Sequence, residues 1–455
     1  MFRSRILVLL VLAMLLMAGC SGQEESEPPS EPVPTQPVEE AKAPADEDES
    51  GAVEEAQPKE PVELFIYNTS ADWDAEGYFM EEYGQHIQTA LPHITPVYLP
   101  TTAGSLRTLA AANQQIDLIM SSVGRAFTIL DSGYQMDLTP YIQKHDFDLA
   151  RFEPSSIKMM EQMGDGKIFG IPFWNMPAPI YYNKDIFDLF GVDYPTDDMT
   201  WDELYERAQR LNRIENGQQY YGLAMSVNHY FLRNQLSVNM VDPANFIVSI
   251  NNDPVKTMLN NLIRFYENVD TPFTSSLLSV GGQRDLFIRD RLAAMWLPVS
   301  TFHTEAELEL LNWDLAKFPK LKEAPDADPQ VYPVYLFISV TSEIPDEVFE
   351  VIEYLTSEEF HVMKSKTGNF VSLLNSEKVR QVFGQDAPMF EGKNVAALFS
   401  DRPADPSPQS RFYADAARAI NTEVFAEVVL GQKDLNTALR EAEEKLQNTI
   451  NEKMR

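Results

Sequence analysis

The chain has 455 residues, a net charge of −33 and a single cysteine. A charge this negative argues against a nucleic-acid phosphate as the partner, and one cysteine excludes an internal disulfide framework and a cysteine-based zinc site. The length exceeds that of one typical domain, so more than one folded part is expected.

The first element along the chain is a predicted export signal. Arg3 and Arg5 precede an unbroken apolar run of 12 residues, 6–17, which is shorter than the ~20 residues that a membrane-spanning helix needs. Small residues then lead to Cys20, in a pattern that resembles the lipobox of bacterial lipoproteins. We therefore expect a lipoprotein signal peptide at 1–19 and a lipid on Cys20. The alternative is an ordinary signal peptide with a chance cysteine.

The next segment, 20–61, is predicted to be a lipid-anchored, disordered spacer. Residues 21–61 hold 13 acids, 2 lysines, 8 prolines and no aromatic residue. Such a composition cannot bury enough apolar surface to offset the entropy lost on ordering. The remaining body, 62–455, still carries a charge of −24, which suits a protein outside the cell.

Strands and helices alternate at the start of the body. The pattern predicts strands at 62–68, 94–99 and 116–122, with helices at 74–91 and 104–114 between them. This order implies an α/β fold with parallel strands and right-handed crossovers. Ligands of such sheets bind beyond the carboxyl ends of the strands, which here are 68–73 and 121–125.

Further elements follow in the second half of the chain. Thr200 and Glu203 form a capping box at the start of a predicted helix over 200–214. Strands are expected at 221–227, 292–298 and 334–342, and two apolar stripes predict two helices after residue 411. Because strands recur late, the chain is expected to return to an earlier sheet.

Enzyme signatures are absent from the sequence. It contains no G-x-S-x-G, no H-E-x-x-H and no G-x-x-x-x-G-K. A glycosidase needs only two carboxylates, so a surface glycosidase or lyase remains an alternative, as does a surface carbohydrate-binding or sensor module without a transport role. The prediction is nevertheless a binding protein that is not an enzyme, with no cofactor and no metal.

Several motifs together resemble one family. The stretches "DGKIFGIPFW", "YYNKDIFDLFGV", "TWDEL", "AQRL" and "LFIRDRLAAMW", with the C-terminal "GQKDLNTALREAEEKLQNTIN", are similar to the extracellular solute-binding proteins of ABC importers. The branch that binds maltose and other oligosaccharides is the most similar. The resemblance implies a two-lobe periplasmic-binding-protein-like fold, in which each lobe is a mostly parallel sheet flanked by helices and hinge strands join the lobes.

The resemblance also implies a function and its partners. The protein would capture a solute, a sugar or an oligosaccharide, by hinge closure and deliver it to an ABC transporter permease. It would act as a monomer on the extracellular face of the cell membrane, anchored through Cys20, and would bind no nucleic acid.

The same resemblance implies where the lobes meet. Lobe one would comprise 62–173 with 297–335, and lobe two 174–296 with 336–455. The chain would cross at 174–179, return at "LAAMWLP" (292–298) and cross a third time at "VYLFISV" (334–340).

The resemblance places candidate ligand contacts at strand ends and crossings, and it places Phe370 in a loop whose aromatic residue often stacks on sugar. Flat side chains can cover the apolar face of a sugar ring, while amides and carboxylates bond its hydroxyl groups. The alternative for each aromatic residue is core packing, and for the polar ones a solvated loop or turn. The candidates are Asp72, Trp73, Ser122, Trp174, Asn175, Tyr230, Trp296, Phe302 and Phe370.

Overall fold

The structure is a computed structural model that describes residues 59–69, 77–267, 269–298 and 305–455. The expected signal peptide, Cys20 and the spacer up to residue 58 lie outside the described residues.

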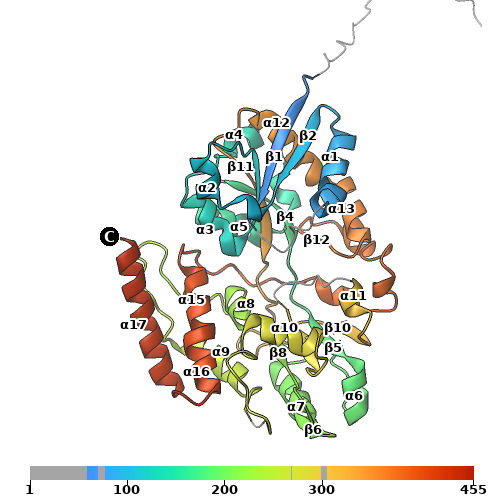
Figure 1. The fold of residues 1–455 in the computed structure, drawn as a ribbon, viewed down its shortest axis with the longest axis vertical. Helices are drawn as coiled ribbons and strands as arrows, with labels where there is room; N and C mark the ends of the chain where they lie inside the picture. The colour runs from blue at the N-terminus through green and yellow to red at the C-terminus, as the bar shows by residue number, and fades with distance from the viewer. Residues whose placement is uncertain (1–58, 70–76, 268, 299–304) are drawn as a thin grey trace, which may run out of the picture. The chain divides into compact units, whose positions relative to one another are not determined.

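A six-stranded sheet organises what we call the first lobe (Figure 1). β1 pairs in parallel with β2 and β3, as the alternating pattern predicts, whereas β11 runs antiparallel to both β3 and β4. The carboxyl ends of β1, β3 and β4 therefore lie at one edge of the sheet. In spatial order the strands are β12 (Val371–Ser372), β4 (Gly170–Asn175), β11 (Pro333–Ile338), β3 (Leu118–Ser122), β1 (Val62–Asn68) and β2 (Ile94–Leu99).

Helices cover this sheet and close its hydrophobic core. Their apolar faces contribute buried residues such as Ile129, Met160 and Ile352 to one cluster with the strands. The helices are α1 (Gln85–Ala90), α2 (Leu106–Ala111), α3 (Val123–Leu130), α4 (Thr139–Lys144), α5 (Pro154–Met163), α12 (Pro345–Leu355) and α13 (Glu358–Lys366). α14 (Glu377–Gln381) packs beside α13.

A four-stranded sheet organises the second lobe. β5 lies between β10 and β9 and runs antiparallel to both, and β8 pairs in parallel with β9. The order is β10 (Trp313–Ala316), β5 (Ile180–Asn183), β9 (Met295–Leu297) and β8 (Ala224–Met225), and β6 (Arg213–Glu215) and β7 (Gln218–Tyr220) form a separate hairpin.

The second lobe is rich in helices, and the last three come from the end of the chain (Figure 1). The predicted capping box at Thr200 and Glu203 is confirmed at the start of α7. Gly431, with φ 67°, follows the end of α16 and suits a glycine at this helix stop. The helices are α6 (Lys184–Phe190), α7 (Trp201–Leu211), α8 (Val227–Leu232), α9 (Asp253–Ile263), α10 (Val280–Ile288), α11 (Glu305–Leu308), α15 (Tyr413–Ala419), α16 (Ala426–Val429) and α17 (Leu435–Lys453).

The strand pairing corrects the expected lobe boundaries. β9 lies inside the second sheet, so 292–298 is not a crossing between lobes. β10 falls within 297–335, which was expected in lobe one, yet it pairs with β5 of the second sheet. α12 falls within 336–455, which was expected in lobe two, yet its apolar face packs in the first core. The expectation failed because a strand's sequence does not state which sheet it joins.

Three segments connect the two sheets. The first crossing, 176–179, leads from β4 to β5, close to the position expected from the sequence. The second crossing, 317–332, leads from β10 back to β11, and the third, 382–412, leads from α14 to α15. The second and third crossings run side by side, because Asp328 and Pro403 form a parallel bridge.

Candidate binding cleft and hinge

A groove runs between α3 of the first lobe and α15 of the second. It has a cavity volume of about 200 Å³, and the second crossing contributes Tyr332 to its wall. The residues that line it include Gly124, Phe127, Asp131, Tyr332, Gln409, Arg411 and Tyr413. We call it the α3–α15 groove. Aromatic, amide and charged residues line one space here, and they come from both lobes and from the second and third crossings.

Two ion pairs join the first lobe to the third crossing, and one of them lies in this groove. Arg411, just before α15, lies 2.5 Å from Asp131 at the end of α3. Lys158 of α5 lies 2.7 Å from Asp405 of the third crossing, with side chains 51% and 76% exposed. We call these the rim pairs. Water and salt reach such charges, so each pair contributes little to the stability of the fold.

Tyr332 links the first lobe to the hinge. Its hydroxyl lies so close to α3 that a Cβ on Gly124 would sit 2.1 Å from the hydroxyl oxygen. The edge of the His229 ring packs on Tyr332, with the ring centroids 5.7 Å apart. Burial raises the pKa of Tyr332, and the nearby charge of Arg233 opposes that rise.

His229, on α8 of the second lobe, is neutral at physiological pH. Burial lowers its pKa to about 3, and the positive charge of Arg233 acts in the same direction. Its Nδ1 atom lies 2.8 Å from the Ser226 hydroxyl. The wall of the hinge therefore presents an uncharged imidazole at pH 7.

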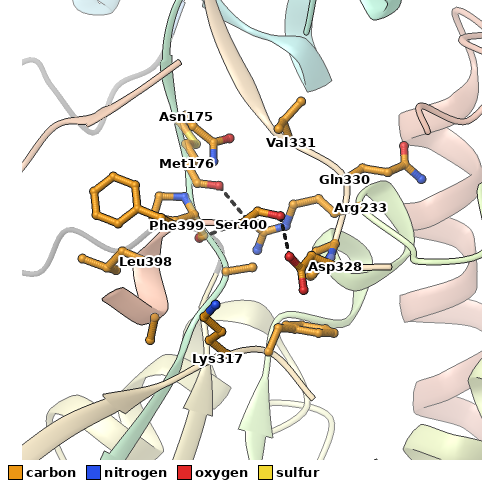
Figure 2. Close-up of a pocket in the computed structure, with 15 residues that line it drawn as sticks. Asn175, Met176, Arg233, Lys317, Asp328, Gln330, Val331, Leu398, Phe399 and Ser400 are labelled. Carbon is orange, nitrogen blue, oxygen red and sulfur yellow. Dashed lines mark hydrogen bonds between the residues drawn. The ribbon is translucent and has the colours of Figure 1, made fainter. Parts of the chain in front are cut away.

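A second, smaller pocket lies among the crossings themselves. It has a volume of about 40 Å³. Figure 2 shows Arg233 reaching toward Met176 of the first crossing, while Asp328 and Ser400 tie the second crossing to the third. The Asp328 carboxylate accepts hydrogen bonds from the Ser400 hydroxyl at 2.8 Å and from the Asp401 and Arg402 amides at 2.8 and 3.0 Å. The pocket is small because the crossings are bonded to one another.

Four of the predicted aromatic contacts are buried in this structure. Trp174 and Phe370 are each 1% exposed and pack together in the first core, with ring centroids 6.3 Å apart. Tyr230 and Trp296, 5% and 1% exposed, lie in the core of the second lobe, where Tyr230 packs on Trp201. In the arrangement described, these rings do not face the groove.

The polar candidates lie nearer to the crossings. Ser122 ends β3, next to Gly124, and is partly exposed. Asn175 ends β4, and its Oδ1 atom accepts a hydrogen bond from the Tyr332 amide at 2.8 Å. Asp72, Trp73 and Phe302 lie outside the described residues.

Several residues around the groove and the hinge escaped the sequence analysis. Arg233 follows the apolar "YFL" of α8, and a charge in such a run was the available signal. Arg411 and Tyr413 follow "DPSPQS", which reads as an ordinary loop before a helix. Their proximity to α3 arises only from the long third crossing, which no local pattern reveals.

Within the described ranges, none of the helices has both the length and the apolar composition to cross a bilayer. The same part of the chain contains no group of three or more His, Cys, Asp or Glu side chains placed to hold a metal ion.

A family model described as "Bacterial extracellular solute-binding protein" matches residues 71–361. Among curated proteins, a mannitol-binding protein of Pseudomonas aeruginosa is 38% identical over 60 residues, a match that spans 13% of this chain and 13% of that protein.

Solved structures of similar fold cover most of the chain. A sugar transporter from Rhizobium etli, in an open conformation, has a TM-score of 0.67 and 20% identity over 85% of this chain and 99% of its own. An ABC substrate-binding protein from Listeria monocytogenes in complex with cycloalternan has a TM-score of 0.67 and 19% identity, covering 86% of this chain and 100% of its own. A sugar-binding protein from Xanthomonas citri has a TM-score of 0.64 and 15% identity, covering 86% and 98%. At these identities the likeness concerns the fold, and it confirms the predicted two-lobe class.

Proposed function

Because the chain belongs to the family of bacterial extracellular solute-binding proteins, we propose that it captures a sugar or an oligosaccharide between its lobes and delivers it to the permease of an ABC transporter. The observation that carries this proposal is the α3–α15 groove, to which both lobes and the second and third crossings contribute residues. A ligand held there would contact both lobes at once, so its binding would favour the closed arrangement.

The chemistry of the groove supports a polyhydroxylated ligand. Tyr332 and Tyr413 contribute aromatic rings to its lining, and Gln409, Arg411 and Asp131 contribute an amide and charged groups. Solved proteins of this fold that are described as sugar-binding, or that hold cycloalternan, support the same ligand class. The short curated match to a mannitol-binding protein adds a sugar alcohol to the ligands to be tested.

The remaining parts of the proposal concern the other candidate contact residues and the anchor. Asp72, Trp73 and Phe302 remain candidates for ligand contact, together with Ser122 and Asn175 at strand ends. Cys20 would become the lipidated N-terminus and hold a monomer on the extracellular face of the membrane, with 20–61 as the spacer. The intact mass of protein from native membranes should show diacylglycerol on a chain that begins at Cys20.

A thermal-shift screen tests ligand capture directly. The panel would hold mono- and oligosaccharides, including maltose, mannobiose and mannitol, with amino acids as controls. A ligand at 100 times its dissociation constant adds about 2.7 kcal/mol to the free energy of unfolding, which is easily measured. Stabilisation by amino acids alone would overturn the ligand class. Turnover of a sugar polymer would identify an enzyme, and binding without transporter-dependent uptake would identify a sensor.

A further inference from the structure

Arg233 makes an unusual set of contacts at the hinge. It follows α8 and is 5% exposed. One guanidinium nitrogen donates hydrogen bonds to the Met176 and Pro177 carbonyls at 2.9 and 3.1 Å, and the other terminal nitrogen donates to the Pro298 carbonyl at 2.8 Å. All three acceptors are main-chain oxygens, so the guanidinium restrains where the backbone runs at these positions. Figure 2 shows the contact with Met176.

These carbonyls need a donor from outside the sheets. Met176 and Pro177 lie beyond the end of β4, and Pro298 lies beyond β9, so no strand ladder supplies them with an amide. A buried carbonyl without a donor is costly, and a charged donor bonds it more strongly than a neutral one. Burial lowers the pKa of Arg233 only to about 10, so the guanidinium stays protonated at pH 7.

The main-chain carbonyl of Arg233 is hydrogen-bonded to the second crossing. The Gln330 amide donates to the Arg233 carbonyl at 3.1 Å. The Gln330 side chain donates to the Asn234 carbonyl at 2.7 Å and to the Ser407 hydroxyl at 2.9 Å, and it accepts from the Ser407 amide at 2.9 Å. Arg233 and its neighbour therefore connect all three crossings through buried polar groups.

We propose that Arg233 is the positioning residue of the hinge. Its side chain ties the first crossing to the end of β9 in the second lobe, its carbonyl holds the second crossing through Gln330, and it so fixes the axis about which the lobes move. The inference rests on the hinge closure proposed above. A lysine would keep the charge but not the planar fork that serves three carbonyls from two directions, so the geometry selects arginine.

Spin-label distances between the lobes test this without any ligand. The labels would sit on Arg107→Cys in α2 and Asn260→Cys in α9, both at exposed positions, in the full chain with Cys20→Ser. We expect Arg233→Met to broaden the interlobe distance distribution relative to the parent, because the first crossing then loses its bonds to the guanidinium and can move separately from the other two crossings. Arg233→Lys should give an intermediate width and remains informative if the methionine variant does not fold.

Leu262→Ala is the matched control, because Leu262 is fully buried in α9 of the second lobe and far along the chain from the crossings. It should lower the unfolding midpoint while leaving the distance distribution unchanged. The inference is overturned if folded Arg233 variants show the parental distribution, or if Leu262→Ala broadens it equally. Adding maltose or mannobiose to the parent tests closure separately, since an unchanged distance with every bound sugar counts against the proposed function and not against Arg233.

Discussion

Two sets of contacts hold the crossings to the lobes, and they differ in burial, in the groups that they join and in their sensitivity to salt. The hinge contacts of Arg233 and Gln330 are buried hydrogen bonds to main-chain carbonyls. The rim pairs, Arg411–Asp131 and Lys158–Asp405, are ion pairs between partly or largely exposed side chains. Breaking the first kind leaves desolvated groups without partners, whereas breaking the second returns two charges to water.

Because of this difference, we expect the hinge contacts and the rim pairs to affect the lobes in different ways. A buried guanidinium with three acceptors restrains where the crossings lie, and salt hardly screens it. The rim pairs join the first lobe to the third crossing, where they contribute a small, salt-dependent bias toward one arrangement of the lobes. The experiments below test this division, from the largest expected effect to the smallest.

Trp174→Ala should cause the largest loss of stability, because the ring is fully packed beside the first crossing. Truncation of a buried tryptophan costs ~3–5 kcal/mol in the free energy of unfolding. The measurement is the urea midpoint together with sugar affinity per folded molecule. If Trp174 instead contacts the ligand after a rearrangement, stability falls less and affinity falls by ~1–3 kcal/mol, taking stacking of bases on aromatic rings as a guide. Trp201→Ala, in the second core, is the reference for a purely structural loss.

Acid should destabilise the first lobe, because it contains the buried His361. This histidine is fully buried against Phe370, and burial lowers its pKa from 6.5 to about 3, with the charge of Arg151 adding to the effect. The unfolded state therefore binds the proton first, so the contribution to stability is complete above pH 6.5 and falls by about 1.4 kcal/mol per pH unit below it, or about 2 kcal/mol at pH 5.

His361→Gln is the variant that isolates this effect, since an amide can still bond the Ser372 hydroxyl, which lies 2.6 Å from the His361 Nδ1 atom. Urea midpoints at pH 7 and pH 5 should differ less for the variant than for the parent. Equal pH dependence in the two proteins would show that His361 does not stay neutral in the fold.

Gly124→Ala tests the contact between the first lobe and the second crossing. The new methyl group would meet the Tyr332 hydroxyl at 2.1 Å, so either α3 or Tyr332 must move, at a cost of ~1–3 kcal/mol. Combining it with Tyr332→Phe should recover much of the loss, as determined from unfolding midpoints. If Gly124→Ala alone is as stable as the parent, α3 and Tyr332 can move apart at no cost, and the contact does not constrain the groove.

Asp131→Asn should produce the smallest change. Loss of an exposed ion pair costs ~0.2–1 kcal/mol, and the difference from the parent should vanish in 1 M salt. Interlobe spin-label distances should shift toward a more open arrangement. Asp346→Asn is the control, because it removes an exposed pair with Lys144 inside the first lobe and should leave the interlobe distances unchanged. If the effect of Asp131→Asn does not depend on salt, the Arg411–Asp131 pair behaves like a buried contact, and the proposed difference between the two sets is wrong.

Local patterns predicted the elements well and the lobe membership poorly. The strands at 62–68 and 94–99 and the capping box at Thr200 depend on neighbours in the sequence, and all three are confirmed. β10 was expected in the wrong lobe, because pairing with β5 is decided by residues more than 100 positions earlier.

The site shows the same limit. Trp174 and Tyr230 were chosen because aromatic residues at a hinge suit a sugar, yet sequence alone cannot tell which face of a strand or helix meets the core. Arg233 and Tyr332 gain their importance from main-chain groups of distant segments, and the main chain leaves no signature in composition.

The first sheet is completed only by a strand from late in the chain, and this has a consequence for folding during export. β11 lies between β3 and β4, yet it follows both by well over 100 residues, most of which belong to the second lobe. While the protein emerges from a translocation channel, β3 and β4 each present an unpaired strand edge at the centre of the unfinished sheet. Such edges are templates for pairing with other chains, and long-range strand closure is slow. A chain halted before residue 333 would therefore be far more prone to aggregate than one halted just after residue 338.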